Sequence, residues 1–385
     1  MVFVMRSWLV LGALAMLISG CAWFSDDDVL RPAELVDFKP TVKLEKLWSE
    51  SPGSGQDARY TRFVPAFSED RIFVADHKGR VFALDQKTGD EIWQHKTELP
   101  ISGAVGAGAG MVLLGTYNGE ILALSQDDGQ ELWRAKASSE ILAPPQANGE
   151  VVIAQTIDGR VFAYDADSGE RRWSYDHPLP VLTLRSTARP LLTDSQLFVG
   201  FDNGQLVCFN PDNGVVQWEV RVGQPQGVSD LDRVVDVDSS PLLVEAIVYS
   251  ASYQGSVVAV SRGTGRVIWR KEASTYRDLA HGNNKLYVAM DDSRLLAYGA
   301  TSGDIFWQNE QMLRRGLKGP AAIDGYVAVM DDEGYMHLLS QADGSFAQRL
   351  KPPGDGFRAP LMSVNNVLYV LSDDGTLTAY QVAND

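Results

Sequence analysis

The stretch GRVFALDQKTGDEIW, residues 79–93, decides the fold because it recurs along the chain. GEILALSQDDGQELW follows at residues 119–133 and GRVFAYDADSGERRW at residues 159–173, so the spacing between these copies is 40 residues. Further copies begin at Gly204, Gly255, Ser293, Gly334 and Gly375. A fixed period of this length indicates a repeat architecture, in which each unit packs on its neighbours.

Each period predicts four short strands. The quoted stretch has the pattern of a β-hairpin, with a turn that contains Asp85 and ends at Gly89. A second strand pair precedes it in RFVPAFSEDRIFVADHKG, residues 62–79. Four short strands bounded by Gly, Asp and Asn turns make one blade of a β-propeller.

The two ends of the chain hold the two halves of one further hairpin. The last copy, GTLTAYQVAND at residues 375–385, has a first strand but no second. The segment VKLEKLWSE, residues 42–50, has the tryptophan strand without a first half. Pairing them removes the open edge of a linear array. The sequence therefore predicts an all-β protein whose residues 39–385 form an eight-bladed β-propeller. Each blade has four antiparallel strands, and the N-terminal strand closes the last blade.

Two repeat positions predict how the blades pack. The tryptophan at the end of the motif is expected to cover the seam between adjacent blades, where it buries a large apolar area. The middle of the third strand is small in most copies, which predicts a crowded interior. Cys208 occupies this small position, so we interpret it as a buried packing residue. The residues at this position are Ala83, Ala123, Ala163, Cys208, Ala259, Ala297 and Ala379.

The N-terminus indicates export. Arg6 is followed by the apolar run SWLVLGALAMLISG, residues 7–20, and then by Cys21. This run is typical of a signal peptide, which we assign to residues 1–20. Its end resembles the bacterial lipoprotein signal, which implies that Cys21 is lipidated and that Ala22 directs the protein to the outer membrane. The alternative is an ordinary secretory signal. We interpret residues 21–38 as a tether.

Composition excludes some partners and cross-links. The formal net charge is −16 and no run of Lys or Arg occurs, so nucleic acid is not an expected partner. After Cys21 the only cysteine is Cys208, so the mature chain has no internal disulfide.

The sequence predicts no catalytic residue, no metal site and no cofactor. The histidines fall in different repeats without metal-ligand spacing, and no H-x-x-x-H, C-x-x-C or G-x-S-x-G motif occurs. Acidic pairs suggest calcium at first, but they stand where other repeats have the turn between the second and third strands. We therefore interpret them as turn residues. These pairs are Asp291–Asp292, Asp331–Asp332 and Asp373–Asp374.

The repeat is interrupted in two consecutive places. The spacings between successive motif starts are 40, 40, 45, 51, 38, 41 and 41 residues. The extra residues fall in DHPLPVLTLRSTARP, residues 176–190, and in VGQPQGVSDLDRVVDVDSSP, residues 222–241. Both segments lie between the outer strand of one blade and the inner strand of the next. We expect them on the same face of the disc, as one continuous binding surface.

The composition of these two loops fits a protein-binding surface. Leu182 and Leu184 are apolar, and Arg185 supplies a planar donor. Asp236 and Asp238 alternate along an extended segment and are expected to present carboxylates on one side. In the alternative reading, the leucines fold inward and the aspartates cap turns.

Two resemblances follow from these features. The A-x-D-x-x-x-G-x-x-x-W repeat resembles that of quinoprotein alcohol dehydrogenases, which use pyrroloquinoline quinone. However, this chain lacks their vicinal cysteines and their long insertions. The lipoprotein signal, the eight blades, LTLR at residues 182–185 and DVDSSP at residues 236–241 are similar to those of the BamB family.

The second resemblance implies a function. It implies a non-enzymatic subunit of the β-barrel assembly machinery at the periplasmic side of the outer membrane. The implied partner is BamA, bound through its POTRA domains by Leu182, Leu184, Arg185, Asp236 and Asp238. Precursors of outer-membrane proteins are a further expected partner, bound at exposed blade edges. The alternatives are a periplasmic ligand-binding propeller and a quinoprotein-type enzyme.

Overall fold

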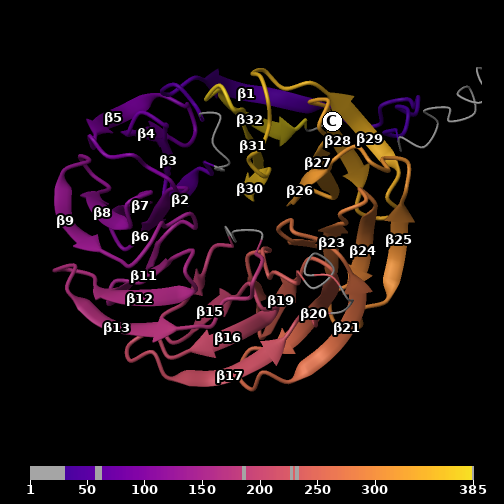
Figure 1. Cartoon of the computed structure of the whole chain (residues 1–385). Helices are drawn as coiled ribbons and strands as arrows, with labels where there is room; N and C mark the ends of the chain where they lie inside the picture. The colour runs from indigo at the N-terminus through magenta and orange to yellow at the C-terminus, as the bar shows by residue number, and fades with distance from the viewer. Residues whose placement is uncertain (1–30, 57–62, 184–187, 226–228, 230–233, 384–385) are drawn as a thin grey trace, which may run out of the picture.

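The protein is a ring of eight four-stranded antiparallel sheets, as the repeat predicted (Figure 1). The computed structural model describes residues 31–56, 63–183, 188–225, 229 and 234–383. Among these residues every regular element is a strand, and none is a helix long and apolar enough to cross a membrane.

In each blade the strands run from the central channel to the rim. Blade 1 contains β2 (Ala66–Ser68), β3 (Arg71–Ala75), β4 (Arg80–Asp85) and β5 (Glu91–Lys96); blade 2 contains β6 (Gly106–Gly108), β7 (Met111–Gly115), β8 (Glu120–Ser125) and β9 (Glu131–Lys136). Blade 3 contains β10 (Gln146–Ala147), β11 (Val151–Gln155), β12 (Arg160–Asp165) and β13 (Arg171–Asp176); blade 4 contains β14 (Leu191–Leu192), β15 (Leu197–Gly200), β16 (Gln205–Phe209) and β17 (Val216–Arg221).

The second half of the ring repeats this order. Blade 5 contains β18 (Leu242–Val244), β19 (Ile247–Ala251), β20 (Gly255–Ser261) and β21 (Val267–Ala273); blade 6 contains β22 (Ala280–Gly282), β23 (Lys285–Ala289), β24 (Leu295–Gly299) and β25 (Ile305–Asn309). Blade 7 contains β26 (Lys318–Ile323), β27 (Tyr326–Met330), β28 (Met336–Ser340) and β29 (Phe346–Leu350); blade 8 contains β30 (Met362–Val364), β31 (Val367–Leu371), β32 (Leu377–Val382) and β1 (Leu44–Glu50).

The two ends of the chain close the ring, as predicted. Strand β1 pairs antiparallel with β32, and Leu44 lies opposite Val382 while Glu50 lies opposite Leu377. The N-terminal strand thereby becomes the outer strand of blade 8. Because β1 pairs with β32, the last strand of the chain has no unpaired edge where the first and last repeats meet.

A tryptophan lock connects adjacent blades. The motif tryptophan of one blade lies against the turn glycine of the next blade, and its indole N–H donates to a carbonyl of that same turn. The donors and acceptors are Trp48 to Gln86 (3.3 Å), Trp93 to Gln126 (2.9 Å), Trp133 to Ala166 (2.7 Å), Trp173 to Pro211 (2.7 Å), Trp218 to Arg262 (2.9 Å), Trp269 to Ala300 (2.7 Å) and Trp307 to Gln341 (3.0 Å).

The lock explains why the turn needs glycine. Gly169 has φ +71°, and a Cβ at this position would lie 2.6 Å from Cε3 of Trp133. The left-handed backbone and the close indole therefore both require a residue without a side chain. The motif glycine and the motif tryptophan are two halves of one contact between different blades.

The seam between blades 7 and 8 lacks this lock. Gln348 stands at the tryptophan position of β29, and blade 8 has no turn between β32 and β1 because these strands are the two ends of the chain. An N-terminal strap, residues 33–43, covers the outer side of blade 7 instead. Thr41 donates its N–H to the carbonyl of Ala347 at 2.9 Å, and Phe38 stacks on Phe346 with 5.3 Å between ring centroids.

A buried ion cluster fastens the start of the strap. Arg315 Nη1 donates to the carbonyl of Ala33 at 2.7 Å, while Nη2 of the same side chain pairs with Asp331 and Glu333, each at 2.7 Å. The Ala33 N–H donates to the Leu313 carbonyl at 2.9 Å. The segment before residue 39 was expected to be a tether. Residues 33–38 instead lie against the propeller, because Ala33 and Phe38 contact residues of the propeller. These partners are distant in the sequence, so the sequence pattern did not indicate the contact.

The same cluster fixes a buried histidine in one tautomer. Arg349 Nε donates to Nδ1 of His337 at 3.2 Å, so the proton of the neutral ring lies on Nε2, which donates to Asp331 at 3.0 Å. Burial lowers the pKa of His337 below its ordinary value. Arg349 also lies over the Phe38 ring at 5.0 Å, so the cluster and the strap form one unit.

We predict that Trp133→Ala lowers the free energy of unfolding by about 3–5 kcal/mol, because it empties the seam between blades 2 and 3 and removes the indole hydrogen bond. Leu132→Ala, on the exposed side of the same strand, is the control and should stay within about 0.5 kcal/mol of the parent protein. Denaturant unfolding checks both values. Equal effects of the two substitutions would contradict the lock.

We predict that Phe38→Ala lowers the free energy of unfolding by about 1–3 kcal/mol, because it removes the stack on Phe346 and the contact with Arg349. Hydrogen exchange should accelerate in β1 and β29 but not in β5 or β9. Lys39→Ala, at an exposed strap position, is the matched control. Uniform acceleration in all blades would show that the strap has no special relation to this seam.

Candidate functional site

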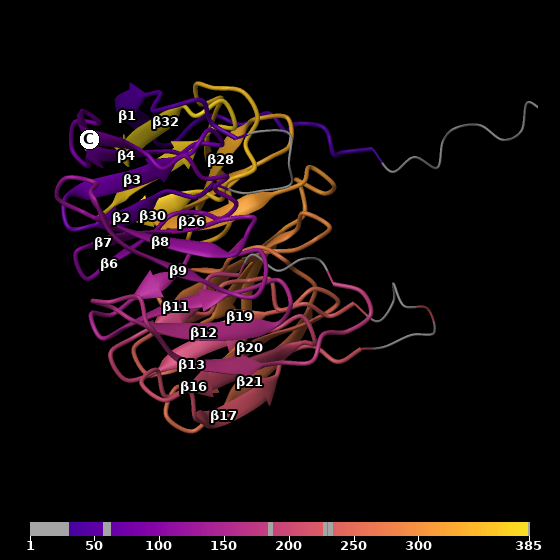
Figure 2. The same cartoon turned by 60° about the vertical axis from the view of Figure 1, so that its left-hand side comes forward.

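The two enlarged loops lie together on one face of the disc. They connect β13 to β14 and β17 to β18, and Figure 2 shows their described parts projecting from the same side. The Arg189 N–H of the first loop donates to Oγ of Ser240 in the second at 3.0 Å. The predicted adjacency of the loops is therefore confirmed for the residues that the structure describes.

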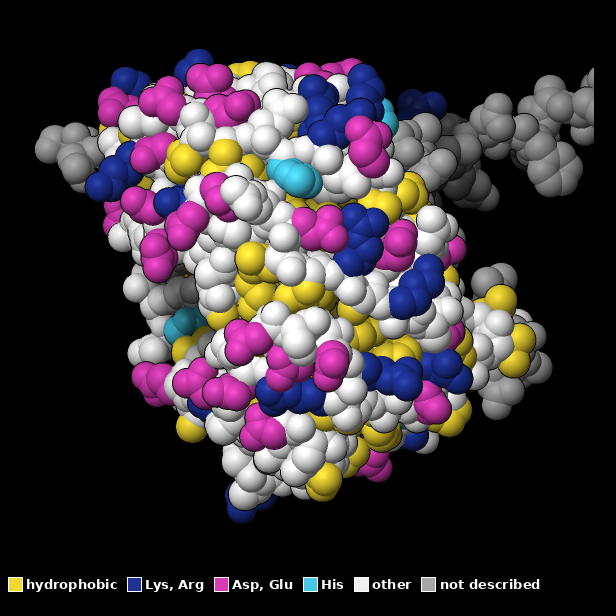
Figure 3. Space-filling view, turned by 90° about the vertical axis from the view of Figure 1, so that its left-hand side faces the viewer, with side chains coloured by type: hydrophobic (Ala, Val, Ile, Leu, Met, Phe, Trp, Pro, Cys, Tyr) yellow, Lys and Arg dark blue, Asp and Glu magenta, His cyan; other side chains and the backbone are white. Residues whose placement is uncertain are grey.

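The first loop exposes apolar side chains. Val181 is 85% exposed, Leu179 43% and Leu182 42%, so the prediction of an exposed Leu182 is confirmed. The apolar projection at the right of Figure 3 lies on this face. Leu184 and Arg185 lie outside the described residues. Val181 and Leu179 were not selected from the sequence, although they precede Leu182 in the same aperiodic loop.

The second loop places its aspartates differently from expectation. Asp236 is 0% and Asp238 8% exposed, so the expected presentation of two carboxylates on the surface is wrong for this structure. The reason is that the segment is covered on both sides. Val237 fills the space above Gly200, where an added Cβ would lie 2.6 Å from its Cγ1, and the Asp236 carbonyl accepts the Tyr253 N–H at 3.0 Å.

A buried carboxylate joins the two loops beneath this surface. Asp202 lies in the turn between β15 and β16, and burial, together with the nearby charge of Asp238, raises the pKa of Asp202 to about 6. The Thr183 hydroxyl of the first loop donates to Asp202, which opposes this rise. Asp202 thus contacts one loop and repels a carboxylate of the other. Its turn resembles those of other blades, so the sequence offered no signal for this role.

The base of the first loop is held by aromatic contact. The His177 ring stacks on Phe201 with 4.1 Å between centroids, and Tyr175 lies 6.1 Å from both rings. Burial lowers the pKa of His177. The first loop therefore starts from a rigid aromatic base, which reduces the conformational entropy that this loop loses when a partner binds.

Catalytic and metal chemistry has little support in the described residues. Within them no group of three His, Cys, Asp or Glu side chains could hold a metal ion. Cys208 is fully buried, and burial raises the pKa of its thiol to about 12, so it is a poor nucleophile. Asp292 and Asp373 pair with Arg294 and Arg358, while Cys21 lies outside the described residues.

Comparison with known sequences identifies close relatives. A family model described as outer membrane protein assembly factor BamB matches residues 40–103, 79–309 and 292–384. The chain is 49% identical to outer membrane protein assembly factor BamB of Pseudomonas aeruginosa over 370 residues, which cover 96% of this chain and 97% of that protein.

Comparison with solved structures agrees. The crystal structure of BamB from Moraxella catarrhalis matches with a TM-score of 0.80 and 28% identity, covering 88% of this chain and 100% of that one. A quinohemoprotein alcohol dehydrogenase from Comamonas testosteroni matches with a TM-score of 0.67 and 15% identity, covering 88% of this chain and 76% of that one. The second likeness shows the fold alone.

We predict that Asp202→Asn removes a pH dependence of stability. The folded-state pKa of about 6 exceeds the ordinary 3.8, so the contribution of this group is full below pH 4 and is lost as the pH rises through 6. Between pH 5 and pH 7.5 the parent protein should lose about 1–2 kcal/mol more than the variant.

Denaturant unfolding at both pH values measures this difference. Asp212→Asn, at an exposed turn of the same blade, is the control and should leave the pH dependence unchanged. The assignment to Asp202 fails when the two variants show the same pH dependence.

Proposed function

The chain belongs to the outer membrane protein assembly factor BamB family, and on that premise we propose that it is a non-enzymatic scaffold of the β-barrel assembly machinery. In this proposal the propeller binds the POTRA domains of BamA on the periplasmic side of the outer membrane. It thereby assists the assembly and insertion of β-barrel proteins.

The single observation that supports this proposal best is the exposed apolar group of the first loop. Leu179, Val181 and Leu182 form an apolar projection on a rigid base, and Arg185 lies three residues after Leu182 in the sequence. Apolar anchors with an adjacent arginine are typical of the centre of a protein interface. We propose that Leu182, Leu184 and Arg185 contact BamA.

The buried aspartates have a different proposed part in the same site. Asp236 and Asp238 lie beneath the loops, and the charge of Asp238 acts on Asp202, which accepts a hydrogen bond from Thr183. Thr183 directly follows Leu182. We therefore propose that these aspartates position the apolar group, and that their loss weakens BamA binding through the loop.

We further propose that lipid on Cys21 holds the propeller at the inner leaflet of the outer membrane. Anchoring two partners at one membrane raises their effective concentration, so a modest interface suffices for stable association. Two or more acyl chains give such an anchor the necessary strength. Precursor strands are a further proposed partner, bound along the exposed outer strands by added β-pairing.

We predict that Leu182→Glu reduces co-purification of BamA from outer membranes at least about tenfold, because a charge replaces an apolar anchor. Leu184→Ala with Arg185→Ala should do the same. Val215→Glu is the control, since Val215 is also an exposed apolar residue but lies in the β16–β17 turn of blade 4 on the opposite face. Unchanged recovery of BamA with folded loop variants would refute the assignment of these residues.

A further inference from the structure

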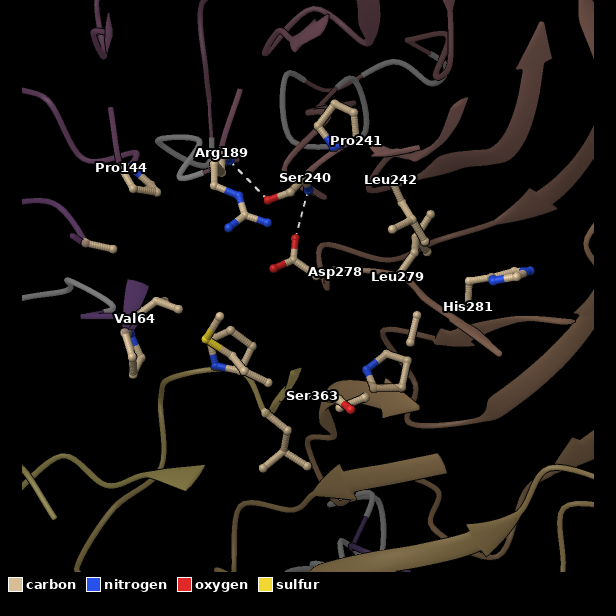
Figure 4. A pocket seen from close by; sticks show the side chains of 18 of the residues that line it. Val64, Pro144, Arg189, Ser240, Pro241, Leu242, Asp278, Leu279, His281 and Ser363 are labelled. Carbon is tan, nitrogen blue, oxygen red and sulfur yellow. Dashed lines mark hydrogen bonds between the residues drawn. The ribbon is translucent and has the colours of Figure 1, made fainter. Parts of the chain in front are cut away.

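The centre of the ring encloses a cavity of about 460 Å³ that opens on the face with the enlarged loops. Every blade contributes to its wall, mainly through residues at the start of its innermost strand. Figure 4 looks into this cavity. Its volume lies within the range of small-molecule sites.

One position in the wall can be compared across the blades. In seven blades the innermost strand pairs with the second strand in the same register, as in Leu242 opposite Tyr249 and Ala280 opposite Tyr287. The residue two places before this pair therefore recurs at the same level of the wall. In chain order these residues are Val64, Ala104, Pro144, Arg189, Ser240, Asp278 and Pro360.

Three adjacent blades have a polar residue at this wall position, where most other blades have an apolar one. Blades 1, 2, 3 and 8 supply Val, Ala or Pro, whereas blades 4, 5 and 6 supply Arg189, Ser240 and Asp278. In a repeat protein such a local departure is not required by the fold, since the other blades meet the same packing with apolar residues. The polar arc therefore needs a separate explanation.

Hydrogen bonds fix the backbone of this arc. Ser240 Oγ accepts the Arg189 N–H at 3.0 Å, and the Ser240 N–H donates to Oδ1 of Asp278 at 2.8 Å (Figure 4). Among the described residues, no carboxylate lies within 4.0 Å of the Arg189 guanidinium, and the side-chain N–H groups of Arg189 donate to none of them. Arg189 and Asp278 thus face one cavity without pairing with each other. The wall also includes His281 and the largely buried Asp238, which is 8% exposed.

The charges restrict the ligand. A simple anion that pairs with Arg189 meets the carboxylate of Asp278, and a simple cation meets the guanidinium. A molecule that carries both a carboxylate and an ammonium group complements both side chains, because guanidinium binds carboxylate through two parallel hydrogen bonds and a carboxylate accepts from ammonium. Leu142, Leu279 and Leu361 in the remaining wall suit an apolar body, and the wall also contains the polar residues Asp238, His281 and Ser363.

We propose that the channel mouth binds a small apolar zwitterion of the amino-acid class. Its carboxylate pairs with Arg189, its ammonium group pairs with Asp278, and its side chain lies against the apolar wall. The two residues that pair with the ligand, Arg189 and Asp278, are not among the proposed BamA contacts, although Asp238 lines the same cavity.

Isothermal titration of the full-length protein with L-phenylalanine tests the proposal. N-acetyl-phenylalanine lacks the cation and phenylalanine amide lacks the anion, so each should bind at least about tenfold more weakly. Equal affinity for the three compounds would overturn the zwitterion assignment. Absence of both binding heat and thermal stabilisation at millimolar L-phenylalanine would overturn the site.

Variants locate the binding. Arg189→Met keeps the apolar stem and Asp278→Asn keeps the shape, and each should weaken L-phenylalanine binding at least about tenfold. Ser363→Ala, in the wall contributed by blade 8, is the control and should leave the affinity unchanged. Arg189→Gln and Asp278→Ser replace any variant whose melting temperature shows misfolding. Full affinity in folded Arg189 and Asp278 variants would overturn the proposal.

Discussion

The contact between an indole and a glycine turn holds this ring together. Each lock joins two blades that share no backbone pairing, and it combines a large buried apolar area with one hydrogen bond from Nε1. The third strand beneath it has room only for a small residue, as Ala163 and Cys208 show by their complete burial. The motif therefore recurs in the sequence because each blade that carries the tryptophan needs the same contact between it and the turn glycine of the next blade. Because blades are rigid, the loops between them can lengthen without disturbing the core.

The lock also explains the unusual seam. A ring closed by strands from both ends of the chain has one blade without a turn between its third and fourth strands, so one lock cannot form. The strap takes its place with different chemistry, namely the Phe38 stack, the Thr41 hydrogen bond and the ion cluster around Arg315. Residues outside the repeat thus complete the repeat structure. We therefore expect the strap residues to stabilise the closed ring, as the tryptophan contacts do between the other blades.

The sequence predicted the ring, its closure and the position of the enlarged loops, because period and spacing carry that information directly. It failed at Asp236 and Asp238, where alternation was taken to mean one buried and one exposed side. That rule holds for a strand with one face in water, and this segment has neighbours on both faces. Asp202 and Arg315 could not be selected, because their importance comes from partners that are distant in the sequence. The strap escaped notice for the same reason, since residues 33–43 show no period of their own.

The docked strap has a geometric consequence for attachment to a membrane. If Cys21 carries the lipid as proposed, only the eleven residues from Ala22 to Pro32 connect it to the docked strap, and a fully extended segment of that length reaches roughly 40 Å. Its fixed end lies at the rim beside blade 7, whereas the enlarged loops connect blade 3 to blade 4 and blade 4 to blade 5. The disc is then attached to the membrane at its rim and not at its centre. A change in its distance from the bilayer therefore also changes its tilt. A taut segment would favour orientations in which the far rim swings away from the bilayer.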